Sequence, residues 1–167
     1  MTPKVIVLMG SGSDFSTVNS TVEILKDFGV DVRVEVTSAH RSPERTEKLI
    51  SEAEREGCEV IIAAAGFAAH LAGVVASHTT LPVIGIPLDA SPLGGLDALL
   101  STVMMPAGIP VATVTVGKTG SKNAAYLALS ILSIKYEGIR ESLKSFRKKM
   151  EGDVIESSRA LNDKSKS

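Results

Sequence analysis

Tryptophan is absent from this 167-residue chain, and cysteine occurs once, at Cys58. A single cysteine excludes an intramolecular disulfide and any multi-cysteine metal site, and it is typical of a protein from a reducing compartment. Because Cys58 lies just before an apolar β-branched run, we expect it to be a buried structural thiol and not a nucleophile.

The chain also lacks an excess of charge of either sign. Its 18 Lys and Arg residues nearly balance its 19 Asp and Glu residues, for a formal net charge of -1. Without a basic excess or a basic stripe before the C-terminal segment, we expect no nucleic-acid partner. No apolar stretch has membrane-spanning length, and the first apolar run is too short for a signal peptide. These features predict a soluble cytoplasmic protein with no membrane partner.

Apolar β-branched runs alternate with segments of helical periodicity along the chain. Such alternation predicts parallel strands joined by helices that cover both faces of a sheet. We therefore expect an α/β fold, a three-layer α/β/α sandwich forming one catalytic domain over residues 1–161, with a disordered tail at 162–167. The expected strands are 5–9, 30–36, 60–65, 83–86 and 111–116. The expected helices start near 13, 43, 68, 96 and 124. The helix from 124 is either continuous or divided in two near Gly138. We expect residues 154–161 to form a final helical segment that packs on a neighbouring subunit.

The loop after the first strand has residue types suited to binding phosphate. Residues 10–14 read G-S-G-S-D, in which glycine permits close backbone approach, serine donates hydrogen bonds and the following helix start favours an anion. The loop is neither a P-loop nor a dinucleotide fingerprint, because the Lys-Ser/Thr pair and the third glycine are missing. A plain strand-to-helix turn with Asp14 as a cap is the alternative.

The loop after the second strand combines a titratable side chain with a fixed cation. His40 and Arg41 precede Pro43, which suits the first turn of a helix. Arginine holds phosphate in a bidentate manner, and histidine exchanges a proton near neutral pH. Since ligand sites of parallel sheets lie at the carboxyl ends of the strands, both loops are expected to face one site. They indicate acid/base chemistry on a phosphorylated small molecule, with a solvated loop histidine as the alternative.

The remaining loops carry weaker signals. Residues 63–73 are nearly devoid of polar side chains except His70, which either touches a substrate or is a half-buried core histidine. His78 is expected at a helix C-terminus, where the helix dipole stabilises it. The loop 87–95 favours turns, and Asn123 either closes the site or helps to cap the last helix. No His, Cys and carboxylate cluster has metal-ligand spacing, so we expect no catalytic metal.

Four short motifs occur in a fixed order along the chain. They are G-S-G-S-D at 10–14, S-A-H-R-S-P at 38–43, A-A-H-L at 68–71 and M-P-A-G-I-P-V-A-T at 105–113. Together they resemble the PurE family of purine biosynthesis, and the resemblance runs from about Val5 to about Leu132. It implies a flavodoxin-like parallel sheet, a homo-octamer with sites between subunits, a ribonucleotide as small-molecule substrate, and no cofactor.

The PurE family contains two reactions. Mutases move the carboxylate of 5-(carboxyamino)imidazole ribonucleotide from the exocyclic nitrogen to carbon C4, whereas carboxylases add carbon dioxide directly to aminoimidazole ribonucleotide. The sequence resembles the mutase class, because Arg41 follows His40 and A-A-H stands at 68–70 where the carboxylase class has Ser-Asn. The direct carboxylase is the alternative. A non-catalytic flavodoxin-like nucleotide- or FMN-binding module is a further one, although only Phe15 lies near the first loop to stack on a flavin.

The resemblance assigns roles position by position. It implies that His40 is the general acid/base and that His70 belongs to the wall of the base pocket. The substrate-binding residues that it implies are Ser11, Ser13, Asp14, Ser38, Arg41, Ala68, His70 and Leu71. Three positions depart from the mutase pattern, with Phe67 in place of Gly, Ala72 in place of Pro and Met104 in place of Gln. The first of these bears on the shape of the carbon dioxide pocket.

Overall fold

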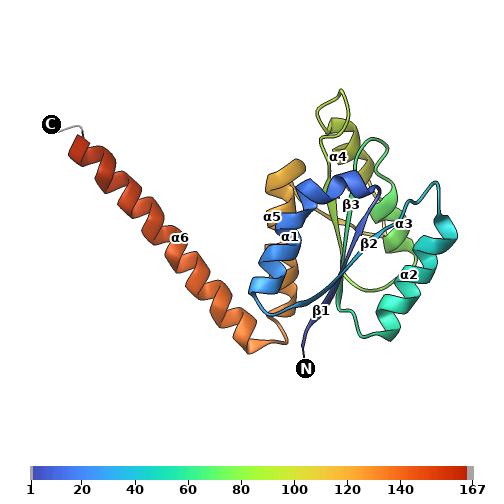
Figure 1. Ribbon diagram of the computed structural model, residues 1–167, viewed down its shortest axis with the longest axis horizontal. Coiled ribbons are helices and arrows are strands. Elements are labelled where there is room, and N and C mark those ends of the chain that lie inside the picture. Colours follow the sequence, from blue (N-terminus) through green and yellow to red (C-terminus); the bar gives the residue numbers. More distant parts are fainter. Residues whose placement is uncertain (1, 165–167) are drawn as a thin grey trace.

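A five-stranded parallel sheet organises the protein in the computed structural model, which describes residues 2–164. The strands are β1 (Lys4–Met9), β2 (Asp31–Val36), β3 (Val60–Ala65), β4 (Val83–Pro87) and β5 (Ala112–Thr113), in the order β2-β1-β3-β4-β5. This order places β1 between β2 and β3. The first crossover therefore adds β2 on one side of β1, and the second adds β3 on the other side. The predicted α/β fold with a parallel sheet is therefore confirmed (Figure 1).

Helices cover both faces of this sheet, as the pattern predicts (Figure 1). The helices of residues 2–164 are α1 (Phe15–Asp27), α2 (Pro43–Arg55), α3 (Leu71–Ser77), α4 (Leu96–Val103), α5 (Gly117–Leu132) and α6 (Glu137–Lys164), with a short 3-10 turn at Gly12–Asp14 before α1. One core cluster joins the sheet to α1 and α5, and the other joins it to α2 and α3. Successive strand residues alternate between the two clusters, Val5 and Val7 facing the first and Ile6 the second. Burial on both faces explains the continuous apolar runs of the inner strands.

The last strand is shorter than the sequence predicts. The run at 111–116 predicts six strand residues, but β5 pairs with β4 only through Ala112 and Thr113. β5 lies at the sheet edge and has one neighbour. The apolar character of the run reflects packing instead, since Val111 and Val114 contact opposite core clusters. Apolar residues that fill a core do not require strand pairing.

Helix α5 begins seven residues before the predicted position, at Gly117 instead of residue 124. One face of its first two turns is buried, with Gly117, Gly120 and Ser121, and the Thr21 hydroxyl of α1 donates to the Ser121 carbonyl at 2.7 Å. Glycine has low helix propensity, but small residues allow α1 and α5 to pack closely, and tertiary packing overrides local preference. Asn123 is consequently an exposed residue of α5 and neither caps the helix nor lines the cavity described below.

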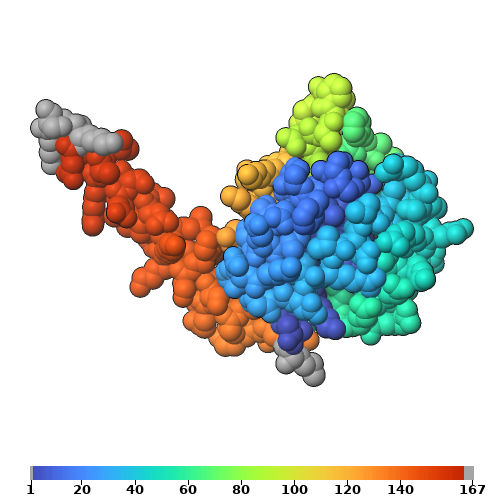
Figure 2. All heavy atoms as spheres, in the orientation of Figure 1, coloured from blue at the N-terminus to red at the C-terminus, as the bar shows by residue number. Residues whose placement is uncertain are grey.

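The predicted helical region from residue 124 consists of two helices, as one of the two alternatives predicts, but the segment 154–161 is a continuous part of α6 and not a separate helix. The break lies at 133–136, where Arg140 donates to the Ser133 and Ile134 carbonyls at 2.8 and 3.1 Å. α6 then extends away from the sheet as an arm (Figure 2). It includes 162–164, part of the predicted tail, because no glycine or proline follows Leu161 to end it. Residues 165–167 lie outside the described residues. No helix within residues 2–164 is long and apolar enough to span a membrane.

Candidate active site

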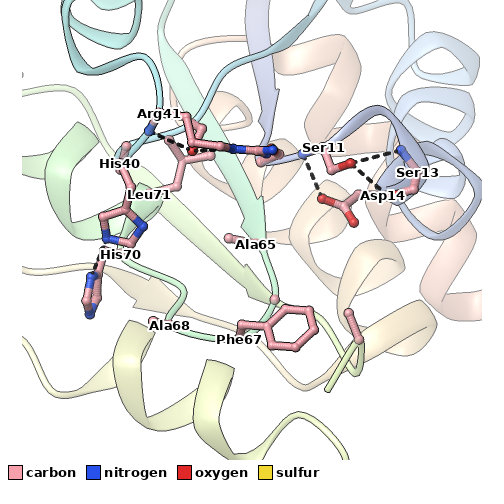
Figure 3. Close-up of a pocket in the computed structure, with 15 residues that line it drawn as sticks. Ser11, Ser13, Asp14, His40, Arg41, Ala65, Phe67, Ala68, His70 and Leu71 are labelled. Atoms are coloured by element: carbon pink, nitrogen blue, oxygen red, sulfur yellow. Dashed lines mark hydrogen bonds between the residues drawn. The ribbon is translucent and has the colours of Figure 1, made fainter. Parts of the chain in front are cut away.

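A cavity of about 370 Å³ opens at the carboxyl ends of β1, β2 and β3 (Figure 3). The nine catalytic and substrate-binding residues that the family resemblance implies all line it, namely Ser11, Ser13, Asp14, Ser38, His40, Arg41, Ala68, His70 and Leu71. Their loops are far apart in the sequence, but adjacent parallel strands bring their carboxyl ends together at one edge of the sheet. The expectation that the first two loops face one site is met by this arrangement. Ala90, after β4, also lines the cavity, and an alanine in a turn-like loop gives no signal by which sequence reasoning finds it.

The first loop is held by its own hydrogen bonds. The Ser11 side chain accepts from the Ser13 N–H at 3.3 Å, and the Ser11 N–H donates to the Asp14 carboxylate at 3.0 Å. These reciprocal bonds form a capping box around the 3-10 turn, so Asp14 fixes the loop and makes no side-chain cap to α1. Burial raises the pKa of Asp14, and the bond from Ser11 partly opposes this. A strand-to-helix turn and a phosphate-binding loop are therefore compatible interpretations of residues 10–14.

The second loop is anchored below the cavity by hydroxyl groups. The buried Thr37 hydroxyl bonds that of Thr46 in α2 at 2.8 Å. The Ser42 hydroxyl accepts from the Ser38 N–H at 3.0 Å, and the Arg41 N–H in turn donates to the Ser38 hydroxyl at 3.2 Å. These bonds fix the backbone that carries the histidine and arginine side chains.

Arg41 links the second loop to the first. Its Nη2 donates to the Gly10 carbonyl at 2.9 Å, which directs the guanidinium toward the Ser11 loop (Figure 3). A guanidinium has five N–H donors. The bond to Gly10 and a long one from Nε to the Ser38 hydroxyl, at 3.5 Å, leave donors for an anion. Serine hydroxyls and a fixed arginine thus form one polar end of the cavity.

Two histidines form the other end of the cavity. His40 Nε2 and His70 Nδ1 lie 2.8 Å apart, and their rings meet nearly at right angles, at 82° (Figure 3). One nitrogen must carry the hydrogen that the other accepts, so the tautomers of the two rings are coupled. Both side chains are exposed, and the reading of His70 as a half-buried core histidine is therefore wrong. The separation of 30 positions between the two histidines in the sequence hides this contact from sequence reasoning.

The third loop forms an apolar wall. The sequence predicts a helix from about residue 68, but α3 begins at Leu71, because the Ala69 and His70 N–H groups bond the carbonyls two residues earlier in tight turns. Glycine is required at position 66, where a Cβ would lie 2.9 Å from the Ala90 Cβ. Phe67 follows with φ +54° and lines the cavity.

Cys58 and His78 lie outside this cavity. Cys58 is buried, its thiol donates to the Val60 carbonyl, and burial raises its pKa, as a structural thiol requires. His78 is exposed at the C-terminus of α3, as predicted. Among residues 2–164, no group of three or more His, Cys, Asp or Glu side chains is placed to hold a metal ion.

Comparison with known proteins gives the cavity a context. The family model described as AIR carboxylase matches residues 4–153. The chain belongs to the AIR carboxylase family. It is 54% identical to the N5-carboxyaminoimidazole ribonucleotide mutase of Saccharolobus solfataricus, over 92% of this chain and 96% of the relative. It is 55% identical to the mutase of the same name from Pyrococcus abyssi, over 89% of this chain and 84% of the relative.

Solved structures agree with membership of the AIR carboxylase family. The structure of Treponema denticola PurE is 32% identical, with a TM-score of 0.85 over 92% of this chain and 95% of that chain. A variant of Treponema denticola PurE2 is 31% identical, with a TM-score of 0.89 over 96% and 99% of the two chains. The family resemblance and the fold that the motifs predict are both confirmed.

Proposed function

We infer that this protein catalyses the N5-carboxyaminoimidazole ribonucleotide mutase reaction of purine biosynthesis, an isomerisation. The observation that carries the inference is the 54% identity to a mutase over 92% of the chain. Direct carboxylation and non-catalytic nucleotide binding are less favoured, because the similar curated relatives are named as mutases.

The polar end of the cavity is suited to holding the ribonucleotide. We assign the phosphate to the Arg41 guanidinium and the hydroxyls of Ser11 and Ser13, with Ser38 supporting the arginine. A guanidinium presents parallel N–H groups that match two phosphate oxygens. Asp14 would accept from a ribose hydroxyl through the carboxylate oxygen that does not bond Ser11. Hydrogen bonds within the protein hold the polar side chains of this end in place before a substrate binds.

The histidine end is suited to the proton transfers. In the proposed first step, His40 protonates the carbamate nitrogen of the substrate, the nitrogen–carbon bond breaks and carbon dioxide is released. In the second, carbon C4 of the electron-rich aminoimidazole attacks the carbon dioxide, and His40 removes the C4 proton. His40 recovers its proton, and the carbon dioxide is bound again at C4. The net reaction is therefore an isomerisation, and no cofactor enters the scheme. An imidazole serves as acid and then base because it titrates near neutral pH.

His70 supports His40 in this scheme through their mutual hydrogen bond. If His40 exchanges the substrate proton through Nδ1, its Nε2 keeps a hydrogen in both protonation states and donates it to His70 Nδ1 throughout. His70 therefore orients the ring of His40 in either protonation state. Ala68 and Leu71 then border the base as apolar neighbours of this pair.

We further propose that catalysis resides in one domain over residues 1–161, that eight copies assemble into a homo-octamer and that the enzyme works in the cytoplasm, where the lone Cys58 stays reduced. Support for assembly comes from two exposed apolar surfaces. One lies on and beside α4, with Leu96, Leu100, Val103 and Met104. The other lies on the arm of α6, with Met150, Val154, Ile155 and Leu161 (Figure 2). Exposed apolar surfaces of this kind mark protein contacts.

Light scattering tests the assembly. The proposal expects about eight times the mass of the chain, since closed symmetric oligomers are the usual form. A monomer across micromolar concentrations would contradict it.

A comparison of two substrates tests the proposed activity. N5-carboxyaminoimidazole ribonucleotide is supplied to one sample, and aminoimidazole ribonucleotide with bicarbonate but without ATP to the other. The proposal expects rapid formation of 4-carboxy-5-aminoimidazole ribonucleotide from the first and much slower formation from the second at physiological bicarbonate. Faster formation from the second would make the protein a direct carboxylase, and binding without turnover of either would make it a binding module.

A further inference from the structure

Phe67 has an unusual backbone conformation for its residue type. Its φ of +54° makes it the one non-glycine residue with a positive φ among residues 2–164. The left-handed region crowds the Cβ of an L residue, a steric cost that glycine avoids. Residues held in this way persist where the surroundings fix them, and they concentrate at functional sites.

Packing within the chain does not explain why a large ring occupies this position. The Phe67 side chain is 57% exposed and belongs to neither core cluster. Its backbone is nevertheless fixed, because its carbonyl accepts from the Ala69 N–H at 2.9 Å and the preceding Gly66 lies against Ala90. The loop thus holds an exposed ring in a defined place.

That place is the cavity. The ring lies on the opposite side of the cavity from the Arg41 guanidinium, on the loop that also carries His70 (Figure 3). Ala65, Ala68 and Leu71 continue this apolar wall. A flat aromatic ring in the wall of the cavity is suited to stacking against the face of a planar heterocycle.

We propose that Phe67 covers the aminoimidazole ring and keeps carbon dioxide in the cavity between its release and its recapture. The proposal rests on the proposed mutase activity and adds a specificity-determining residue to it. Carbon dioxide carries no charge, so its recapture depends on confinement and on exclusion of water. The apolar ring supplies that confinement on the side of the cavity that the polar groups leave open.

An isotope experiment tests this role. The substrate carries carbon-13 in its carbamate group, the buffer contains unlabelled bicarbonate, and the label in the C4 carboxylate of the product is measured by mass spectrometry. An enzyme-free sample gives the spontaneous loss of the carbamate. The variants are Phe67→Gly, which removes the ring and relieves the backbone strain, and Phe67→Leu, which keeps apolar bulk. Phe15→Ala is the matched control, because Phe15 is an exposed ring that does not line the cavity.

The proposal expects the wild type, Phe67→Leu and Phe15→Ala to retain most of the label, and Phe67→Gly to lose several-fold more of it. It also expects Phe67→Gly to unfold at a temperature no lower than the wild type, which a merely structural role would not produce. If Phe67→Gly does not fold, Phe67→Ala replaces it. Label retention by the ring-deleted variant at the wild-type level would overturn the proposal, and so would complete loss from the wild type. A wild type that does not convert the substrate at all would instead overturn the proposed function.

Discussion

The two ends of the cavity are built differently. At the polar end, Ser11, Asp14 and Arg41 are tied to the backbone of the loops, and their positions are set by bonds that exist without a substrate. At the other end, His40 and His70 are exposed and bond each other, through a contact whose hydrogen can belong to either ring. A fixed end is suited to binding, and an end that exchanges protons is suited to chemistry. Substitutions at each end should therefore have distinct kinetic effects.

The largest expected effect follows from His40→Asn. The variant should assemble and bind ribonucleotide normally but lose turnover by on the order of 100-fold or more, the size of a lost acid/base contribution. His40→Gln is the sharper companion, because its amide lies near the former Nε2 and still bonds His70 but cannot titrate. Turnover and calorimetric affinity are measured on both variants. Near-normal turnover of either would remove His40 from the mechanism.

Arg41→Lys tests the other end and should act on binding. An ammonium cannot reproduce the two parallel bonds of a guanidinium, and a hydrogen bond to a charged group contributes about 1.5–3 kcal/mol. Affinity for the ribonucleotide should therefore fall about tenfold or more, while turnover at saturation stays close to wild type. Calorimetry gives the affinity, and circular dichroism checks the fold. An unchanged affinity would show that phosphate is held elsewhere.

A smaller effect is expected at His70. Asparagine places an amide near the Nδ1 position that bonds His40, whereas alanine removes the partner. A neutral hydrogen bond contributes about 1 kcal/mol, so His70→Ala should lower turnover about fivefold and His70→Asn by less. The pH profile of turnover is recorded for both variants. A loss at His70→Asn as large as at His40→Asn would show that His70 itself transfers the proton.

The smallest effect concerns stability. Because burial raises the pKa of Asp14 above its ordinary 3.8, the folded protein binds this proton more tightly than the unfolded chain does. The contribution of Asp14 to the free energy of unfolding is fully present below 3.8 and is lost as pH rises through the raised pKa.

Asp14→Asn should remove this pH dependence. The effect on the free energy of unfolding should be less than about 1 kcal/mol, because the carboxylate is half-exposed and solvent screens it. Urea unfolding from about pH 4 to about pH 6 measures it as the difference from wild type. Asp27→Asn, at an exposed position of α1, is the control. A wild-type free energy of unfolding that rises with pH relative to that of Asp14→Asn would reverse the assignment.

The sequence predicts the inner strands of the sheet well, because strands that are buried on both faces consist of consecutive apolar residues. β1 and β3 appear as unbroken apolar runs, and the predicted bounds of β3 are those observed. The start of α5 is missed because Gly117 and Gly120 favour a loop locally, whereas in the folded chain they are helical and lie against Asp89 and the Thr115 carbonyl. Local preference therefore fails where close tertiary contact decides the structure.

The site residues are predictable for a related reason and with a related limit. Strand ends of a parallel sheet must converge, so loops rich in glycine, serine, histidine and arginine are predicted to meet. What no local pattern encodes is the bond between His40 and His70, or the left-handed backbone of Phe67. Both depend on how the third loop turns after β3, which only the folded chain determines.

Single-turnover kinetics with enzyme in excess tests the division between the two ends most directly, because it separates chemistry from binding. His40→Asn and Arg41→Lys are compared side by side with the wild type over a range of enzyme concentrations. We predict that His40→Asn lowers the rate at saturation with little change in the half-saturating concentration, and that Arg41→Lys raises the half-saturating concentration with little change in the rate. If both variants altered the rate at saturation and the half-saturating concentration in the same way, the account would be contradicted.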